Sequence, residues 1–211
     1  MADVKIYSAC DRAIREMDRE NVEAFGRLKM ADWDEVNVIR TVKAVYRTAQ
    51  KRARKRYYEV GFEAYLLAMA MCGAEPGKAH QMAEKAITEE WVDSVLTETD
   101  PLTLYRFDSE AERKAYRLAE ALEIAQDRNR EIDKALRYWS QQLAQYAINV
   151  TDYAAIQAFK DYGIRKVRWV SEQDGRECSK CHGLDEQVFD IDDIPVKPHL
   201  KCRCRLMPAK E

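Results

Sequence analysis

Five residues near the C-terminus have the types and the spacing of metal ligands. Cys178 and Cys181 form a C-x-x-C pair. His199 and Cys202 form a second pair with the same spacing, and Cys204 follows two residues later. Thiolate and imidazole ligands in this combination favour tetrahedral Zn²⁺. The sequence therefore predicts a zinc site made of Cys178, Cys181, His199 and Cys202, with Cys204 as an alternative to Cys202.

The predicted zinc site is structural rather than catalytic. Four protein ligands fill a tetrahedral shell and leave no position open for water. His182 is an alternative to His199 as the imidazole ligand. A competing interpretation is that the cysteines are reduced and packed in a small core, or that two of them form a redox-sensitive pair. A thioredoxin-like role is disfavoured because no strand–helix–strand pattern surrounds Cys178.

The segment that carries these residues differs in character from the rest of the chain. After Gly163, residues 164–171 are β-branched and aromatic and predict a strand. Residues 172–211 hold three of the five prolines and four of the six cysteines. A unit of this size buries little apolar surface, so it needs a metal, a disulfide or a scaffold. We therefore predict a helical body over residues 1–163 and a small β-rich Cys/His module over residues 164–211.

The body is predicted to be an elongated bundle of long helices. Seven Gly and five Pro in 211 residues are too few for the turns of an all-β fold. Helices are expected over residues 3–28, from Asp32 or Asp34 through residue 71, and over residues 78–96. In the second of these, apolar or small side chains recur at three- and four-residue spacing from Ile39 to Val60 and define one buried face. The fold class is mainly α, with a small, zinc-stabilised β-rich module at the C-terminus (α+β).

An apolar seam over residues 115–150 predicts one further long helix. Ser109 followed by Glu112 matches a helix capping box. From there, apolar positions alternate three and four residues apart over five heptads, with Asn129 at one of them. A buried Asn fixes helix register, and a local bend at this point is an equal alternative. The seam packs on the helix over residues 33–72 or on a second copy, so self-association through residues 115–150 is one interpretation.

A basic stripe lies beside the apolar face of the second helix. It consists of Arg40, Lys43, Arg47, Lys51 and Arg54, which repeat at three- and four-residue spacing. Such a stripe can track the phosphates of double-stranded DNA with salt-dependent affinity. The competing interpretation is a solvated face that the following acidic helices partly neutralise.

The chain lacks the common catalytic motifs. It has no G-x-S-x-G, no H-E-x-x-H and no glycine-rich phosphate loop. Asp190, Asp192 and Asp193 are close in sequence, but Ile191 between them and Ile194 after them favour an acidic loop. We therefore expect no enzyme; a small toxin or hydrolase would instead require an open metal position and a cleft near Asp192.

Neither a membrane nor an export route is indicated. The longest apolar run, residues 64–72, is shorter than the roughly 20 residues of a membrane span. The first ten residues lack the apolar core of a signal peptide. We expect a soluble protein made in a bacterial cytoplasm, and its formal net charge of -2 gives no global attraction for nucleic acid.

The spacing of residues in the module resembles the C-terminal signature of a known family. The matching positions are Trp169, Asp174, Cys178, Cys181, Gly183, Leu184, Phe189, Pro198, His199, Cys202, Arg203, Cys204 and Pro208. This string is similar to that of the phage Mu F-like minor head proteins, a phage head morphogenesis family. The resemblance covers about residues 110–208, and its specific part is confined to residues 169–208.

The resemblance implies a minor capsid protein of a tailed phage or prophage. Such a protein is located in the virion, inside the procapsid or head, at the portal vertex. Its partners are the portal protein and capsid subunits, and it acts in DNA packaging or ejection. The alternative is a zinc-stabilised nucleic-acid-binding or adaptor protein of the host.

Overall fold

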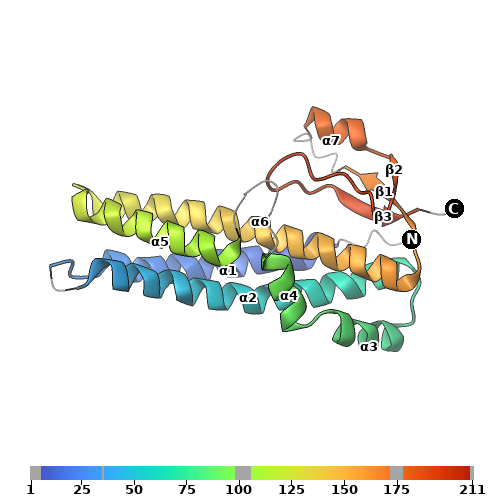
Figure 1. The fold of residues 1–211 in the computed structure, drawn as a ribbon, viewed down its shortest axis with the longest axis horizontal. Coiled ribbons are helices and arrows are strands. Elements are labelled where there is room, and N and C mark those ends of the chain that lie inside the picture. Colours follow the sequence, from blue (N-terminus) through green and yellow to red (C-terminus); the bar gives the residue numbers. More distant parts are fainter. Residues whose placement is uncertain (1–5, 35, 98–105, 172–177, 210–211) are drawn as a thin grey trace.

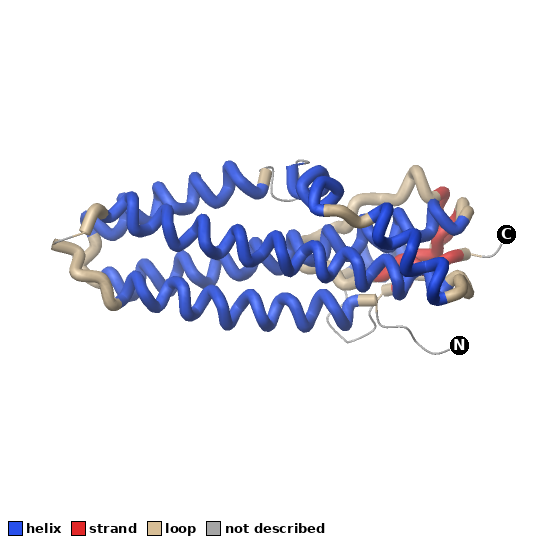
Figure 2. Tube along the Cα trace, turned by 90° about the horizontal axis from the view of Figure 1, so that it is seen from below, coloured by secondary structure: helices blue, strands red, loops and turns tan. Residues whose placement is uncertain are grey.

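Four long helices lie side by side and form an elongated bundle, and a small sheet sits at one end of it (Figures 1 and 2). The computed structural model describes residues 6–34, 36–97, 106–171 and 178–209. The helices are α1 (Tyr7–Lys29), α2 (Val38–Met71), α3 (Pro76–Ala86), α4 (Glu89–Thr97), α5 (Phe107–Ile124), α6 (Arg128–Tyr162) and α7 (Ser179–Leu184). The strands are β1 (Lys166–Val170), β2 (Val188–Asp190) and β3 (Arg205–Pro208). The predicted class, mainly α with a small β-rich part at the C-terminus, is confirmed.

A chain of aromatic contacts joins the four long helices. The Phe25 ring of α1 meets the Tyr46 ring of α2 edge-on, with centroids 5.2 Å apart. Tyr46 in turn contacts Trp139 of α6 at 5.1 Å. Trp139 stacks on Phe107 of α5 at 6.0 Å with an interplanar angle of 15°. All four side chains are buried, so each long helix contributes one aromatic anchor to a common core.

The second helix follows the predicted pattern but begins later. Val42, Tyr46, Ala53, Tyr57 and Val60 are buried, as their spacing predicted, and the helix continues to Met71. Its start at Val38 is set by a cap. The Asn37 side chain accepts a hydrogen bond from the Arg40 backbone N at 3.0 Å, which satisfies one of the free amides at a helix N-terminus. The predicted start at Asp32 or Asp34 is therefore wrong.

One of the predicted helices is interrupted. The single helix predicted over residues 78–96 is two helices, α3 and α4, with Ile87 and Thr88 between them. Ile87 is fully buried and has extended backbone geometry. The Thr88 hydroxyl accepts a hydrogen bond from the Trp91 backbone N at 3.1 Å and so caps the new helix.

The predicted long helix through residues 115–150 is also wrong, because the chain turns back between α5 and α6 (Figure 1). Asp127 caps α6 by accepting a hydrogen bond from the Arg130 backbone N at 3.0 Å. Asn129 is exposed and fixes no register. The capping box does not form either, because α5 begins at Phe107 and the Ser109 hydroxyl donates to the Arg106 carbonyl.

The apolar side chains of the seam are buried within this chain. Ala115, Leu118 and Leu122 of α5 are buried, as are Ile132, Trp139, Leu143, Tyr146 and Val150 of α6. Both helices pack on α2, which is one of the two partners predicted. These side chains are therefore not available as a surface for self-association.

A three-stranded antiparallel sheet follows the bundle. Gly163 ends α6 with a φ of 90°, a left-handed conformation that glycine adopts without strain. β1 then forms the central strand and pairs with β2 on one side and β3 on the other. Val167 and Trp169 of β1 are buried and belong to the same apolar core as the bundle. In the described part of the chain, no helix has both the length and the apolar character of a membrane span.

Candidate metal centre

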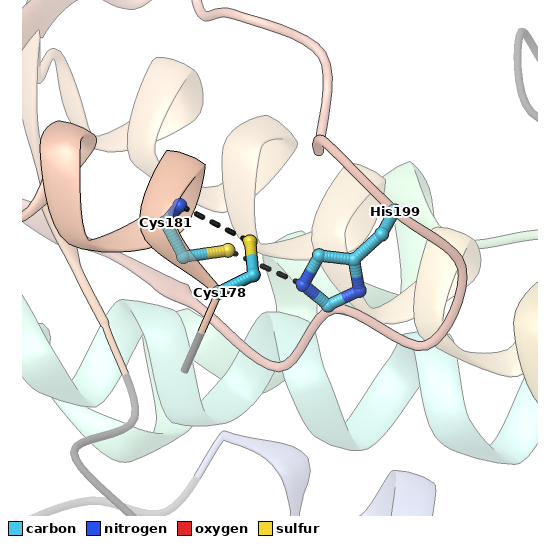
Figure 3. A group of neighbouring side chains, drawn as sticks. All are labelled: Cys178, Cys181 and His199. Carbon is cyan, nitrogen blue, oxygen red and sulfur yellow. Dashed lines mark hydrogen bonds between the residues drawn. The ribbon is translucent and has the colours of Figure 1, made fainter. Parts of the chain in front are cut away.

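The first two candidate ligands are positioned by the short helix α7. Cys178 is its N-cap residue, and its Sγ accepts a hydrogen bond from the Cys181 backbone N at 3.3 Å. This turn brings the Cys178 and Cys181 side chains to the same side, facing His199 (Figure 3). Cys181 is buried with 1% of its surface exposed. The C-x-x-C spacing thus corresponds to the first turn of α7, which places both sulfurs at the start of this helix.

The third candidate approaches from the loop before β3. His199 Nε2 lies 3.3 Å from Cys181 Sγ (Figure 3). Its Nδ1 lies 2.9 Å from the Leu200 carbonyl oxygen, which can only accept a hydrogen bond. Nδ1 therefore carries the proton, which leaves the Nε2 lone pair facing the thiols. Metal-binding histidines are oriented by this kind of hydrogen bond.

Two more thiols lie on the other side of Cys181. Cys202 Sγ is 3.6 Å from Cys181 Sγ, and both Cys202 and Cys204 are buried. The donor atoms form two groups, each with all members within 4.8 Å of one another. The groups are Cys178, Cys181 and His199, and Cys181, Cys202 and Cys204. Cys181 is common to both and lies at the centre of the cluster.

Two distances in this cluster approach those between the ligands of a zinc ion, but the described residues do not bring four donor atoms within 4.8 Å of one another. Zinc–sulfur bonds of about 2.3 Å and zinc–nitrogen bonds of about 2.0–2.1 Å place tetrahedral ligands roughly 3.8 Å apart for two sulfurs and roughly 3.6 Å for sulfur and nitrogen. The sulfur–sulfur distance of 3.6 Å and the sulfur–nitrogen distance of 3.3 Å are close to these edges. All six cysteines are free thiols. When bound, the ion would join α7 to the loop before β3.

The protonation of the thiols differs across the cluster. The hydrogen bond from the Cys181 backbone N lowers the pKa of Cys178. Burial raises the pKa of Cys181 to about 12. The neighbouring Cys204 thiol, followed by burial, raises the pKa of Cys202. Without a cation the buried thiols are therefore neutral, and a metal that binds them must displace protons.

His182 lies apart from this cluster. It is exposed on α7 and belongs to neither donor group. His199 is therefore the imidazole that the structure brings to the thiols.

Bundle residues that the sequence did not single out hold the loop that carries His199 and Cys202. Lys197 Nζ lies 2.8 Å from Asp152 Oδ2 of α6 and also contacts the Tyr7 hydroxyl of α1. The Lys201 backbone N donates to Gln145 Oε1 of α6 at 2.6 Å. Burial raises the pKa of Asp152, and the Lys197 ammonium opposes that shift. No sequence pattern indicated these contacts, because they join residues up to 190 positions apart.

Two of the five cations in the predicted basic stripe form ion pairs with acidic residues of the bundle, and the other three form none with the described residues. Lys43 Nζ contacts Glu112 at 3.3 Å and the Tyr116 hydroxyl at 2.6 Å. Arg54 lies 2.9 Å from Asp93 and 2.8 Å from Asp108. Arg40, Arg47 and Lys51 are exposed, and within the described residues they form no ion pair. Three of the five cations are thus available to a ligand.

An open cleft of about 460 Å³ lies beside the acidic loop, between α4, α6 and residues 191–197. Trp91, Ile156, Val196 and Asp192 contribute to its walls. A hydrolase would place a metal and an acid–base pair here. Asp192, however, forms an ion pair with Lys160 at 2.6 Å. None of the candidate metal ligands is among the described residues that line the cleft.

The C-terminal half of the chain thus defines a class of protein: a helical hairpin that carries a small sheet with a Cys/His cluster. Residues 109–207 match the model of the family described as "Phage Mu protein F like protein". Over these residues the chain is similar to the phage Mu F-like proteins, and the match begins within α5, spans α6 and ends within β3. No curated protein and no solved structure matches the chain. Similarity to this family indicates a protein of phage head morphogenesis that associates with head components in the virion.

Proposed function

We propose that this protein is a minor head protein that acts at the portal vertex during head assembly and in DNA packaging or ejection. The observation that carries the proposal is the family match across the hairpin, the sheet and the Cys/His cluster together. The rod-like bundle supports it, because a rod presents long helical faces to portal and capsid subunits (Figure 2). The family is structural, and a catalytic role is not part of the proposal.

A test requires the phage or prophage that encodes the chain. Deleting the gene should leave capsid and portal proteins in the particles while lowering infectivity or packaged DNA. The wild-type protein should co-purify with procapsids in low copy, and it should be lost from procapsids assembled without portal. Its absence from purified wild-type particles would contradict the proposal and favour the alternative, a zinc-stabilised nucleic-acid-binding or adaptor protein of the host.

We propose further that the module over residues 164–211 holds one structural zinc ion. The ligands are Cys178, Cys181 and His199, with Cys202 as the fourth and Cys204 as its alternative. The support is two distances, from Cys181 Sγ to His199 Nε2 and to Cys202 Sγ, which are close to the edges of a zinc tetrahedron. Replacing Cys202 and Cys204 by serine one at a time, with zinc content measured for each variant, identifies the fourth ligand. Stoichiometric zinc in neither the wild type nor the variants would reject the site.

A second candidate activity, contact with double-stranded DNA, rests on a separate observation. Arg40, Arg47 and Lys51 are exposed along one helix, where they can meet phosphates. Within a head, such contacts would place packaged or exiting DNA along the bundle. Replacing all three cations tests this activity without touching the module.

A further inference from the structure

The loop before β3 has two opposite attachments. Toward the cluster it supplies the ligands His199 and Cys202. Toward the bundle it supplies the Lys197 ammonium, the Lys201 backbone N and the Cys204 carbonyl oxygen. The same short segment therefore faces the metal on one side and the helices on the other.

Gln145 determines the backbone conformation between the two ligands. Its side chain is buried with 3% of the residue exposed, and its Oε1 accepts from the Lys201 N at 2.6 Å. Its Nε2 donates to Asn149 Oδ1 at 2.8 Å, which fixes the orientation of the amide. Lys201 has a φ of 57°, a left-handed conformation that a lysine adopts only when it is held. Because Lys201 immediately precedes Cys202, this hydrogen bond fixes how the two ligands face each other.

Tyr7 and Asp152 hold the rest of the loop. Lys197 Nζ donates to Asp152 and to the Cys202 carbonyl oxygen at 3.1 Å. The Tyr7 hydroxyl contacts Asp152 and lies 3.2 Å from the carbonyl oxygen of Cys204. Tyr7 of α1 thus restrains the Cys204 backbone directly, and Asp152 of α6 restrains the Cys202 backbone through Lys197.

We infer that Gln145, Tyr7 and Asp152 are positioning residues for the metal and that they couple metal binding to docking of the module on the bundle. This inference rests on the zinc site proposed above. When the loop is docked on the bundle, His199 and Cys202 are already in position. Less conformational entropy is then lost when the ion binds. By reciprocity, the bound ion strengthens the attachment of the loop to the helices by the same factor.

The experiment compares zinc affinity among variants that retain every ligand. Gln145→Ala removes the hydrogen bond to Lys201, and Tyr7→Phe removes only a hydroxyl. Gln141→Ala is the matched control, because Gln141 is exposed on the same helix and its side chain forms no hydrogen bond within the described part of the chain. Affinity is measured by competition with a chromophoric chelator, starting from metal-free protein. We expect about 10–100-fold weaker binding for the first two variants and wild-type binding for the control.

The reciprocal arm measures docking directly. Hydrogen exchange of residues 197–206 in the wild type should accelerate when zinc is removed, while exchange in the middle of α2 stays constant. In Tyr7→Phe the same segment should exchange faster than in wild type with zinc present. Far-UV circular dichroism verifies that each variant folds; if Gln145→Ala does not, Tyr7→Phe decides the result.

The outcomes separate the two proposals. If the wild type binds no zinc, the zinc site is wrong and the coupling falls with it. If the wild type binds zinc and the folded variants bind it equally tightly, the zinc site stands and the coupling is overturned. Weaker binding by the control to the same extent as the variants would also overturn it.

Discussion

The α2 cations that form no ion pair with the residues described make the strongest quantitative prediction. Arg40, Arg47 and Lys51 span about 16 Å of helix axis at 1.5 Å per residue. If each neutralises one phosphate, the logarithm of the DNA-binding constant should fall against the logarithm of salt with a slope of about −2.7. Between about 50 and 200 mM salt, affinity should then drop on the order of 40-fold. Changing all three residues to alanine should remove that dependence.

Fluorescence anisotropy of a labelled DNA duplex, titrated at several salt concentrations, measures this slope. The matched control is the double variant Lys43→Gln with Glu112→Gln, which removes an existing ion pair and leaves the net charge unchanged. It should keep the wild-type slope. An equal slope in the triple alanine variant and the wild type would refute the assignment of these residues to a DNA interface. The stripe would then be a solvated face.

Three further predictions concern stability and the metal. Trp139→Ala should lower the free energy of unfolding by about 3–5 kcal/mol, because it removes the aromatic contact shared by α2, α5 and α6. Urea denaturation measures this change. A loss below about 1 kcal/mol would contradict that role of Trp139. Cys181→Ser should abolish stoichiometric zinc, whereas Cys72→Ser should retain it, because Cys72 belongs to neither donor group. Zinc content by mass spectrometry decides, and equal zinc in both variants would reject Cys181 as the central ligand. Asp127→Ala should destabilise the protein by about 1 kcal/mol through loss of the α6 cap, and an unchanged thermal midpoint would argue against the cap.

Local sequence patterns predicted those helices and strands in which the spacing of apolar residues agrees with the face that packs on other elements. The buried face of α2 follows from its three- and four-residue spacing, because one side of this helix meets α1, α5 and α6. The strand after Gly163 follows from the run of β-branched and aromatic residues. The C-x-x-C and H-x-x-C spacings predicted one group of Cys178, Cys181, His199 and Cys202. In the structure Cys178, Cys181 and His199 form one group, and Cys202 lies with Cys181 and Cys204 in a second.

The reversal of chain direction between α5 and α6 could not be predicted from the spacing of the apolar residues. Both helices bury their apolar residues toward α2, and the spacing happens to continue across the turn from Leu122 to Ile132. Periodicity reports which residues are buried and carries no information on chain direction. The capping side chain of Asp127 was the available signal, since it precedes Arg130 at the distance of an N-cap contact.

The attachments of the loop could not be predicted from local sequence at all. Tyr7, Asp152 and Lys197 look like ordinary surface or helix residues in their own segments. Their roles arise only when α1, α6 and the last loop meet. Long-range polar contacts of this kind can be identified only from the folded structure, because the partners are far apart in the sequence.

The contact of α1 with the last loop also constrains the order of folding. Asp11 and Arg203, 192 positions apart, lie 2.7 Å from each other across this junction. On the ribosome, 192 positions of chain separate the synthesis of these two partners. The contact between α1 and the loop can therefore form only after α6 and β1 have been synthesised.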